Sequence, residues 1–138
     1  MFAVGLTGLP APAKAGPDDA RQAAEQFVQA LTTGKPEALQ KILPRSGKIL
    51  VAIRSTRQTA GNFSRSQVEV IFNRYLSEFS FRDCRIDHIE VQESSYSRID
   101  LTANRSGPGD TLAPVLFRLA MQSEEGHWVL REIRESSP

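Results

Sequence analysis

The sequence predicts an α+β domain in which the helices are segregated from an antiparallel sheet. Two observations carry this prediction. Apolar residues recur at helical spacing in three segments before residue 80, whereas four later segments alternate as strands do. The polar joints between these four segments, ESS, RSGPGD and SEEG, are short enough for hairpins, so we expect an antiparallel meander.

The first two helices are predicted from their boundaries. Asp18 and Asp19 can cap a first helix whose alanine, phenylalanine and leucine residues share one face, and Gly34 ends it. The segment GKPEALQKILP predicts a short second helix, because Pro36 suits a first helical position and Pro44 ends the pattern. KILVAIR then predicts a strand, and STRQTAGN predicts a turn with a short return strand.

The segment GNFSRSQVEVIFNRYLSEF, residues 61–79, predicts the third helix and its start. With Ser64 at the N-cap, Gln67 completes a capping box, and Phe63 and Val68 take the positions of a hydrophobic staple. Such a cap stabilises a helix by about 1 kcal/mol. A nucleophilic Ser64 would need a base, and no histidine lies nearby in sequence, so capping is the favoured interpretation.

The four strands of the meander are expected at Cys84–Glu93, Tyr96–Asn104, Leu112–Gln122 and His127–Arg134. Pro114 lies near the start of the third strand, where a missing backbone donor is tolerated. The full order is therefore helix, helix, strand, helix and four strands.

Composition and charge exclude several classes of protein. The 138 residues suffice for one domain with an ordinary core, and 40% hydrophobic with 24% charged residues is typical of soluble globular proteins. A net charge of +1 gives no electrostatic footprint for nucleic acid, and no apolar run approaches the ~20 residues that cross a bilayer. Cys84 is the single cysteine, so no internal disulfide is expected; we interpret it as a buried hydrophobe on a strand rather than a reactive thiol.

Residues 1–15, MFAVGLTGLPAPAKA, have the apolar stretch and A-x-A ending of a secretory signal peptide. The basic region that begins such peptides is absent, and a disordered tail is the alternative. With the signal-peptide interpretation, residues 16–138 form the mature domain and the protein is periplasmic or secreted. Otherwise a cytoplasmic protein is expected.

The order of these motifs resembles the nuclear-transport-factor-2-like superfamily, a group with a cystatin-like α+β fold. The resemblance rests on GKPEALQKILP followed by GKILVAI, on a helix capped by FSRSQ that continues as VEVIFNRYLSEF, and on a meander ending in HWVLREIR. It covers about residues 18–135 and is strongest for small secreted bacterial domains of unknown function. It implies a cone in which a curved antiparallel sheet wraps around a long helix, with a cavity at the open end.

The resemblance implies two kinds of function. Members of the superfamily include ketosteroid isomerases, dehydratases and polyketide cyclases, and others only bind ligands or partners, often as homodimers through the outer sheet face. Many catalytic members carry an acid where the first strand enters the cavity. The matching segment here, Pro44–Lys48 (PRSGK), has no carboxylate. We therefore predict a non-catalytic, exported module that binds a small apolar ligand in the cavity or a protein partner. The alternatives are a small isomerase, dehydratase or cyclase, and a structural homodimer.

His88 is the best single candidate for chemistry. Strict alternation places it on the face of Cys84 and Ile86, where it could act as a general base with Asp87 or Asp100 nearby. The alternative is a half-buried strand histidine, or one at a bulge where the faces switch.

Tyr75 and Trp128 complete the candidate ligand-binding set with His88. The Tyr75 ring lies on the apolar face of its helix, and its hydroxyl needs a partner if it is buried or serves as a hydrogen-bond donor in a pocket. Trp128, Phe117 and Tyr96 line an apolar pocket or a dimer face, or simply belong to the core.

No metal site or cofactor is expected. Two histidines without acids at matched spacing do not form a metal site, and GPGD has no helix behind it to bind a phosphate. The segments SSYSR and REIRE are mixtures of charges and hydroxyls, which we interpret as exposed strand faces.

Overall fold

The computed structural model describes residues 16–56, 58–93, 95–109 and 111–138. The predicted signal peptide, residues 1–15, lies outside the described residues. Among the described helices, none is long and apolar enough to cross a membrane. The elements along the chain are α1 (Pro17–Thr33), the 3-10 helix η1 (Pro36–Lys41), β2 (Ile49–Ile53), β3 (Gly61–Phe63), α2 (Arg65–Glu78), β4 (Ser80–Gln92), β5 (Tyr96–Ser106), β6 (Leu112–Glu124) and β7 (His127–Ser136).

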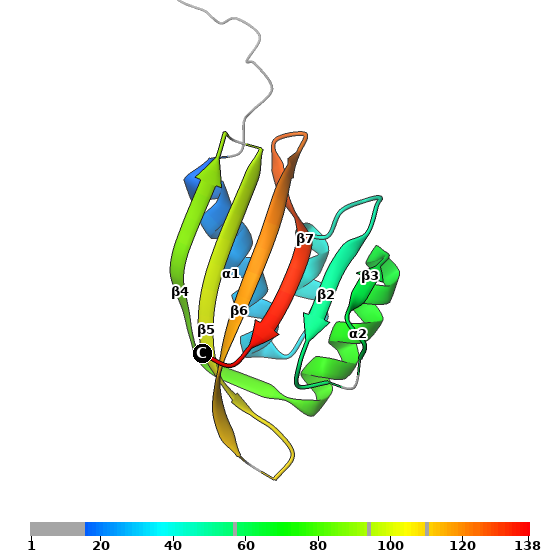
Figure 1. Cartoon of the computed structure of the whole chain (residues 1–138), viewed down its shortest axis with the longest axis vertical. Coiled ribbons are helices and arrows are strands. Elements are labelled where there is room, and N and C mark those ends of the chain that lie inside the picture. The colour runs from blue at the N-terminus through cyan, green and yellow to red at the C-terminus, as the bar shows by residue number, and fades with distance from the viewer. Residues whose placement is uncertain (1–15, 57, 94, 110) are drawn as a thin grey trace, which may run out of the picture.

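The strands form one six-stranded sheet in the order β3-β2-β7-β6-β5-β4 (Figure 1). The predicted meander is confirmed, because β4, β5, β6 and β7 pair antiparallel in turn, and β3 is the predicted return strand of β2. The expectation of a wholly antiparallel sheet is wrong, since β2 runs parallel to β7. A hairpin would force these two neighbours to be antiparallel, but α2 and four strands separate them along the chain.

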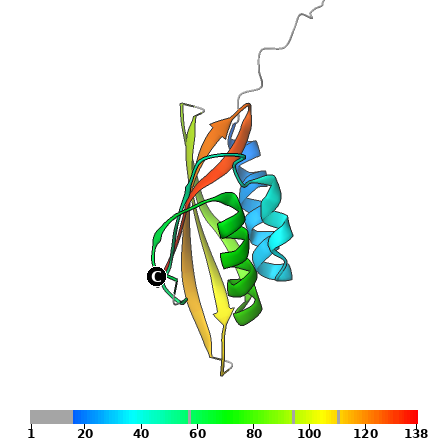
Figure 2. The same ribbon diagram turned by 90° about the vertical axis from the view of Figure 1, so that its right-hand side faces the viewer.

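All three helices lie on one face of the sheet, which we call the inner face; the opposite face is the outer face (Figure 2). α1 lies against the long strands, and α2 lies beside β2 and β3 (Figures 1 and 2). The resemblance implied a sheet that wraps around a long helix, and α1 takes that place. The α+β cone is confirmed, with the two long helices sharing its inner face.

The predicted start of α2 is confirmed. The Ser64 backbone N–H donates to Gln67 Oε1 at 2.8 Å, and the Gln67 N–H donates to Ser64 Oγ at 3.4 Å. Arg65 adds a tertiary contact, because its guanidinium donates to the carbonyl oxygens of Leu43 at 3.0 Å and Gln40 at 3.1 Å. The Ser64-Arg65-Ser66 segment thus begins a helix and fastens it to η1.

Replacing Ser64 with alanine is expected to lower the free energy of unfolding by about 1 kcal/mol, because the first turn of α2 loses its side-chain acceptor. Urea denaturation followed by circular dichroism measures the difference. Ser66→Ala, two residues along in the same turn, is the matched control: its hydroxyl lies 3.3 Å from Ser64 Oγ but accepts no backbone N–H of the described residues, so its loss is expected to cost less. Equal losses for the two variants would contradict the capping role of Ser64.

The start of α1 differs from its prediction. Gly16 is the N-cap and Pro17 the first helical residue, and the Asp19 carboxylate accepts a hydrogen bond from the Gly16 N–H at 3.2 Å. The caps predicted at Asp18 and Asp19 are thus inside the first turn, where their negative charges still favour the helix N-terminus.

The second helix is also shorter and tighter than expected. η1 covers six residues as a 3-10 helix rather than an α-helix. Pro36 and Pro44 bracket too few residues for a stable α-helix, and 3-10 hydrogen bonds close a turn with one residue fewer.

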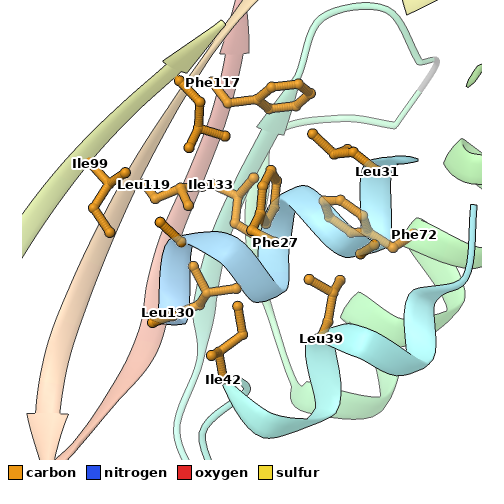
Figure 3. Packing of buried hydrophobic residues seen from close by; sticks show 14 of the residues in the cluster. Phe27, Leu31, Leu39, Ile42, Phe72, Ile99, Phe117, Leu119, Leu130 and Ile133 are labelled. Carbon is orange, nitrogen blue, oxygen red and sulfur yellow. The ribbon is translucent and has the colours of Figure 1, made fainter. Parts of the chain in front are cut away.

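Side chains fill the interior between the helices and the sheet (Figure 3). Phe27 of α1 meets Phe72 of α2 edge-on at 5.9 Å between ring centroids and Phe117 of β6 at 5.4 Å. Phe117 also contacts Phe81 at 5.8 Å and Tyr75 at 6.4 Å. The rings that are fully buried are those of Phe27, Phe72, Phe117 and Tyr75. Because this aromatic cluster occupies the interior, a ligand site must lie nearer the surface.

Candidate binding site at the open end of the sheet

A buried carboxylate lies on the inner face close to the end of β7. Glu135 is 3% exposed, and four donors surround it. Its Oε1 accepts the backbone N–H of Ser55 at 3.0 Å, while its Oε2 accepts the Ser55 hydroxyl at 2.5 Å and Arg105 Nη1 at 3.2 Å. The Tyr75 hydroxyl also donates to Oε2. We call Glu135, Ser55, Tyr75 and Arg105 the Glu135 network.

Strand alternation brings the network together from four elements. Glu135 follows buried Ile133 by two residues on β7, so both side chains point to the inner face. Ile53 of β2 pairs with Glu135, and Ser55 comes two residues after it. Arg105 of β5 and Tyr75 of α2 approach the same point from the two other sides.

Sequence reasoning missed Glu135. The segment REIRE was interpreted as an exposed strand face, and that is wrong for this residue, which is the only buried charged side chain in the described part of the chain. The signal was present, because Ile133 and Glu135 are two residues apart and therefore share a face. Its three partner residues were not recognisable, since they come from positions between 30 and 80 residues away.

Tyr75 is a core residue with a bound hydroxyl. Its ring is fully buried and packs against Phe79 and Phe81 with ring centroids 5.5 and 5.4 Å apart. Burial raises the pKa of the Tyr75 phenol far above its ordinary value of 10.0, and the negative charge of Glu135 raises it further. The hydroxyl is held in its protonated, donating form.

This pKa shift predicts a pH dependence. The folded state binds the Tyr75 proton more tightly than the unfolded chain does, so the stability that this group contributes is complete below pH 10.0 and is lost as the pH rises above it. In a Tyr96→Phe variant, which leaves Tyr75 as the only tyrosine, we expect no tyrosinate absorbance until the protein unfolds. Ionisation near pH 10 with a native circular dichroism spectrum would contradict the assignment.

Arg105 and Phe79 form a rigid wall beside the network. The Arg105 guanidinium lies 4.8 Å above the centre of the Phe79 ring while it pairs with Glu135. Gly107 lies against the same ring, and a Cβ at that position would come within 2.7 Å of Phe79 Cε1. Only glycine allows this close approach, so the ring is held between β5 and the turn that follows it.

Two clefts flank the network. The mouth cleft, with a volume of about 370 Å³, lies between α2, the segment after β2 and the β5–β6 turn, and it is lined by Ser55, Thr56, Gln58, Val70, Ile71, Arg74, Glu78, Phe79 and Pro108. The terminal cleft, of about 240 Å³, lies at the end of β7 and is lined by Arg54, Ser55, Arg105, Ala113, Pro114, Val115, Glu135, Ser136 and Ser137. Ser55 borders both.

His88 lies away from these clefts. A register shift between Ile86 and His88 turns the histidine to the outer face, opposite Asp100, and its side chain is exposed. The prediction that His88 shares a face with Cys84 and Ile86 is wrong for this reason, and the alternative of a histidine at a bulge is confirmed. His88 and Tyr75 therefore do not meet in a common cavity.

Trp128 is at the other end of β7 from Glu135. It is 3% exposed, and its Nε1–H donates to the carbonyl oxygen of Gly16 at 3.1 Å, which fastens the start of α1 to the sheet. Phe117 is in the core and Tyr96 is 40% exposed. The three predicted ligand-binding residues, Tyr75, His88 and Trp128, thus occupy three separate places.

The other metal-ligating and nucleophilic side chains of the described residues do not form a metal site or a catalytic centre. Within the described ranges, no group of three or more histidine, cysteine, aspartate or glutamate side chains is placed to hold a metal ion. Cys84 is half-buried on β4, and burial raises the pKa of its thiol, with a further contribution from the charge of Asp83. A thiol in this state is a poor nucleophile, in agreement with its interpretation as a hydrophobe.

Known structures share this architecture. A DUF4783 family protein from Bacteroides uniformis superposes with a TM-score of 0.68 at 12% identity, over 83% of this chain and 95% of that one. An NTF2-like protein of unknown function from Shewanella oneidensis gives a TM-score of 0.65 at 13% identity, over 87% of this chain and 98% of that one. The chain has the nuclear-transport-factor-2-like fold. A ketosteroid isomerase-like protein from Erwinia carotovora atroseptica also has this fold, with a TM-score of 0.65, 11% identity, and coverage of 86% and 94%.

The likeness extends to the fold alone. The chain matches no protein-family model and no curated protein in sequence. The structures that share the fold at such low identity include a DUF4783 family protein and a ketosteroid isomerase-like protein. What this NTF2-like chain binds or does must therefore be argued from its own residues.

Proposed function

We propose that this NTF2-like chain is a non-catalytic binding module whose ligand occupies the mouth cleft. The observation that carries the proposal is the saturation of Glu135. A carboxylate has about four lone-pair sites, and Glu135 already accepts four hydrogen bonds, from the Ser55 N–H, the Ser55 hydroxyl, Tyr75 and Arg105. A general base must also lie within reach of the substrate proton, and Glu135 does not line the mouth cleft. The Glu135 network is best interpreted as a support for the wall of the cleft.

The composition of the mouth cleft supports binding of a small amphipathic molecule. Its volume of about 370 Å³ falls within the range of ligand pockets. Ile71, Phe79 and Val70 offer apolar surface, and 64% of Val70 is accessible to a ligand. Gln58 and Arg74 add polar groups at the rim. The predicted apolar ligand within the cone is thereby revised to an amphipathic one at its mouth.

The alternative is an enzyme of the isomerase, dehydratase or cyclase kind, favoured by the likeness to the isomerase-like protein. It would need a base beside a donor. Tyr75 is a donor, but its hydroxyl is bound to Glu135, and His88 is on the other face of the sheet. We therefore place binding ahead of catalysis.

The test is a ¹H–¹⁵N chemical-shift titration with a set of small aromatic alcohols and amines. We expect perturbed resonances to cluster at residues 55–58 and 70–79, and Val70→Asp to weaken binding at least tenfold. Tyr96→Asp is the matched control, since Tyr96 is 40% exposed and lies at the opposite end of β5 from the turn that borders this cleft, and it should leave the affinity unchanged. Perturbations centred on His88 would overturn the proposal in favour of the outer face.

Export and dimerisation are further parts of the proposal. The pattern of residues 1–15 supports export, and a protein recovered from a bacterial periplasm should begin near Gly16; a start at Met1 would contradict processing.

A homodimer through the sheet would bring together outer faces that carry the ion pairs Asp100–Arg118 and Glu132–Arg134. Light scattering should give twice the monomer mass, and a monomer at 100 μM would contradict this part.

A further inference from the structure

We propose that the terminal cleft is a second site, which binds the oxyanion group of a small carboxylic acid or phosphate monoester between Arg54 and Arg105. This inference goes beyond the mouth cleft, with which it shares only Ser55. It rests on the shape of the sheet at this end, the fixed position of one arginine and the unbalanced charge of the other.

The cleft exists because β7 ends before β6 does at this end of the sheet. The first residue of β6 that pairs with β7 is Leu116, opposite Ser136, whereas β6 continues to pair with β5 down to Leu112 opposite Ser106. The β5–β6 hairpin consequently extends past the end of β7 (Figure 1). The space left in the sheet, between the end of β2 and residues 113–115 of β6, is the terminal cleft.

Arg105 is held ready for a ligand. Its Nη1 donates to Glu135 Oε2 at 3.2 Å, and its guanidinium is stacked on Phe79, so most of its side-chain freedom is already lost. Among the described residues, no acceptor is bound to its Nε or Nη2. A guanidinium has five N–H donors in a planar fork that matches carboxylate and phosphate oxygens, so donors remain for a ligand in the cleft.

Arg54 provides the net positive charge. The negative charge of Glu135 neutralises the positive charge of Arg105, and the Glu135 oxygens accept hydrogen bonds from Arg105, Ser55 and Tyr75. Arg54 lines the same cleft, is exposed, and forms no ion pair with any carboxylate in the described part of the chain. The cleft therefore contains two guanidinium groups and one carboxylate, a balance that attracts an anion.

The other walls limit the size of the ligand. The Ser136 and Ser137 hydroxyls line the cleft and can donate to a bound oxyanion. Ala113 and Val115 provide a small apolar wall opposite them. A volume of about 240 Å³ accommodates a compact molecule that joins an oxyanion to a short hydrocarbon part.

The experiment titrates the full chain with three probes: sodium butyrate, propyl phosphate and, as the neutral control, butanol. Binding is followed by isothermal titration calorimetry and by ¹H–¹⁵N chemical shifts. We expect saturable binding of at least one anion, with shifts at residues 54, 55, 105 and 136, and none for butanol. Butyrate alone would assign a carboxylate ligand, and propyl phosphate alone a phosphate ligand. No saturable shift with either anion at 10 mM would overturn the proposal.

Variants locate the site. Arg54→Gln should weaken anion binding at least tenfold, whereas Arg98→Gln, an exposed arginine elsewhere on β5, should change it less than twofold. Arg105→Lys keeps a charge opposite Glu135 but loses the planar fork, and it should also weaken binding while the fold is retained. The mouth-cleft variant Val70→Asp should bind the anion normally, which separates this proposal from the proposed function. Equal losses for Arg54→Gln and Arg98→Gln would mean non-specific attraction and would contradict it.

Discussion

Replacing Glu135, the buried charged residue of the described part of the chain, with glutamine is expected to lower the free energy of unfolding by about 3–5 kcal/mol. The carboxylate compensates Arg105 and accepts hydrogen bonds from Ser55 and Tyr75. Removing one partner of a buried ion pair leaves the other uncompensated, and losses of this size are typical. The amide would also present a donor to groups that are themselves donors. Urea denaturation of the two proteins measures the difference.

Glu132→Gln is the matched control. Glu132 lies on the same strand three residues earlier and pairs with Arg134, but both side chains are partly exposed on the outer face. Ion pairs in such positions contribute about 0–1 kcal/mol, so this variant should be close to the parent in stability. A loss below 1 kcal/mol for Glu135→Gln, or equal losses for both variants, would show that the Glu135 network does not support the fold.

Replacing Phe117 with alanine is expected to cost about 3–5 kcal/mol through lost burial and the cavity left behind. The ring is fully buried and contacts Phe27, Tyr75 and Phe81. The residual space would lie in the middle of the interior. We therefore also expect the variant to gain affinity for benzene, because an apolar cavity of sufficient size binds apolar molecules.

Leu112→Ala tests whether the effect of Phe117→Ala comes from the interior. Leu112 is on the same strand and is 46% exposed, so its truncation should change the stability by less than about 0.5 kcal/mol. Thermal unfolding of each variant with and without benzene measures both the loss of stability and the affinity for benzene. A parent protein that already binds benzene inside would contradict the description of the interior as filled by side chains.

Local sequence signals predicted the elements of this NTF2-like fold well. The Ser64–Gln67 capping box located the start of α2 to the residue, and alternation with short polar joints predicted β4 to β7 as a meander. These features depend on residues close together in sequence. The parallel pairing of β2 with β7 was missed because it depends on residues about 80 positions apart.

The candidate site was predicted less well, for two physical reasons. A bulge between Ile86 and His88 inverts the alternation that had assigned His88 to the interior, and such bulges leave little trace in sequence. Glu135 was taken as exposed because charged residues are seldom buried, and its burial is possible only with partners from the turn after β2, from β5 and from α2. Tyr75 alone pointed to this region, since a phenol on an apolar helix face needs an acceptor.

Our central proposal is that this chain is a binding module whose ligand occupies the mouth cleft, because side chains fill the interior and Glu135 is already hydrogen-bonded. The most direct test is a high-resolution crystal structure of the protein equilibrated with the amphipathic compounds that bind in solution. We predict ligand density in the mouth cleft, against Val70 and Phe79, with the Tyr75 hydroxyl still bound to Glu135. Ligand density inside the cone, with Tyr75 released from Glu135 and bound to the ligand, would contradict the account and favour the enzyme.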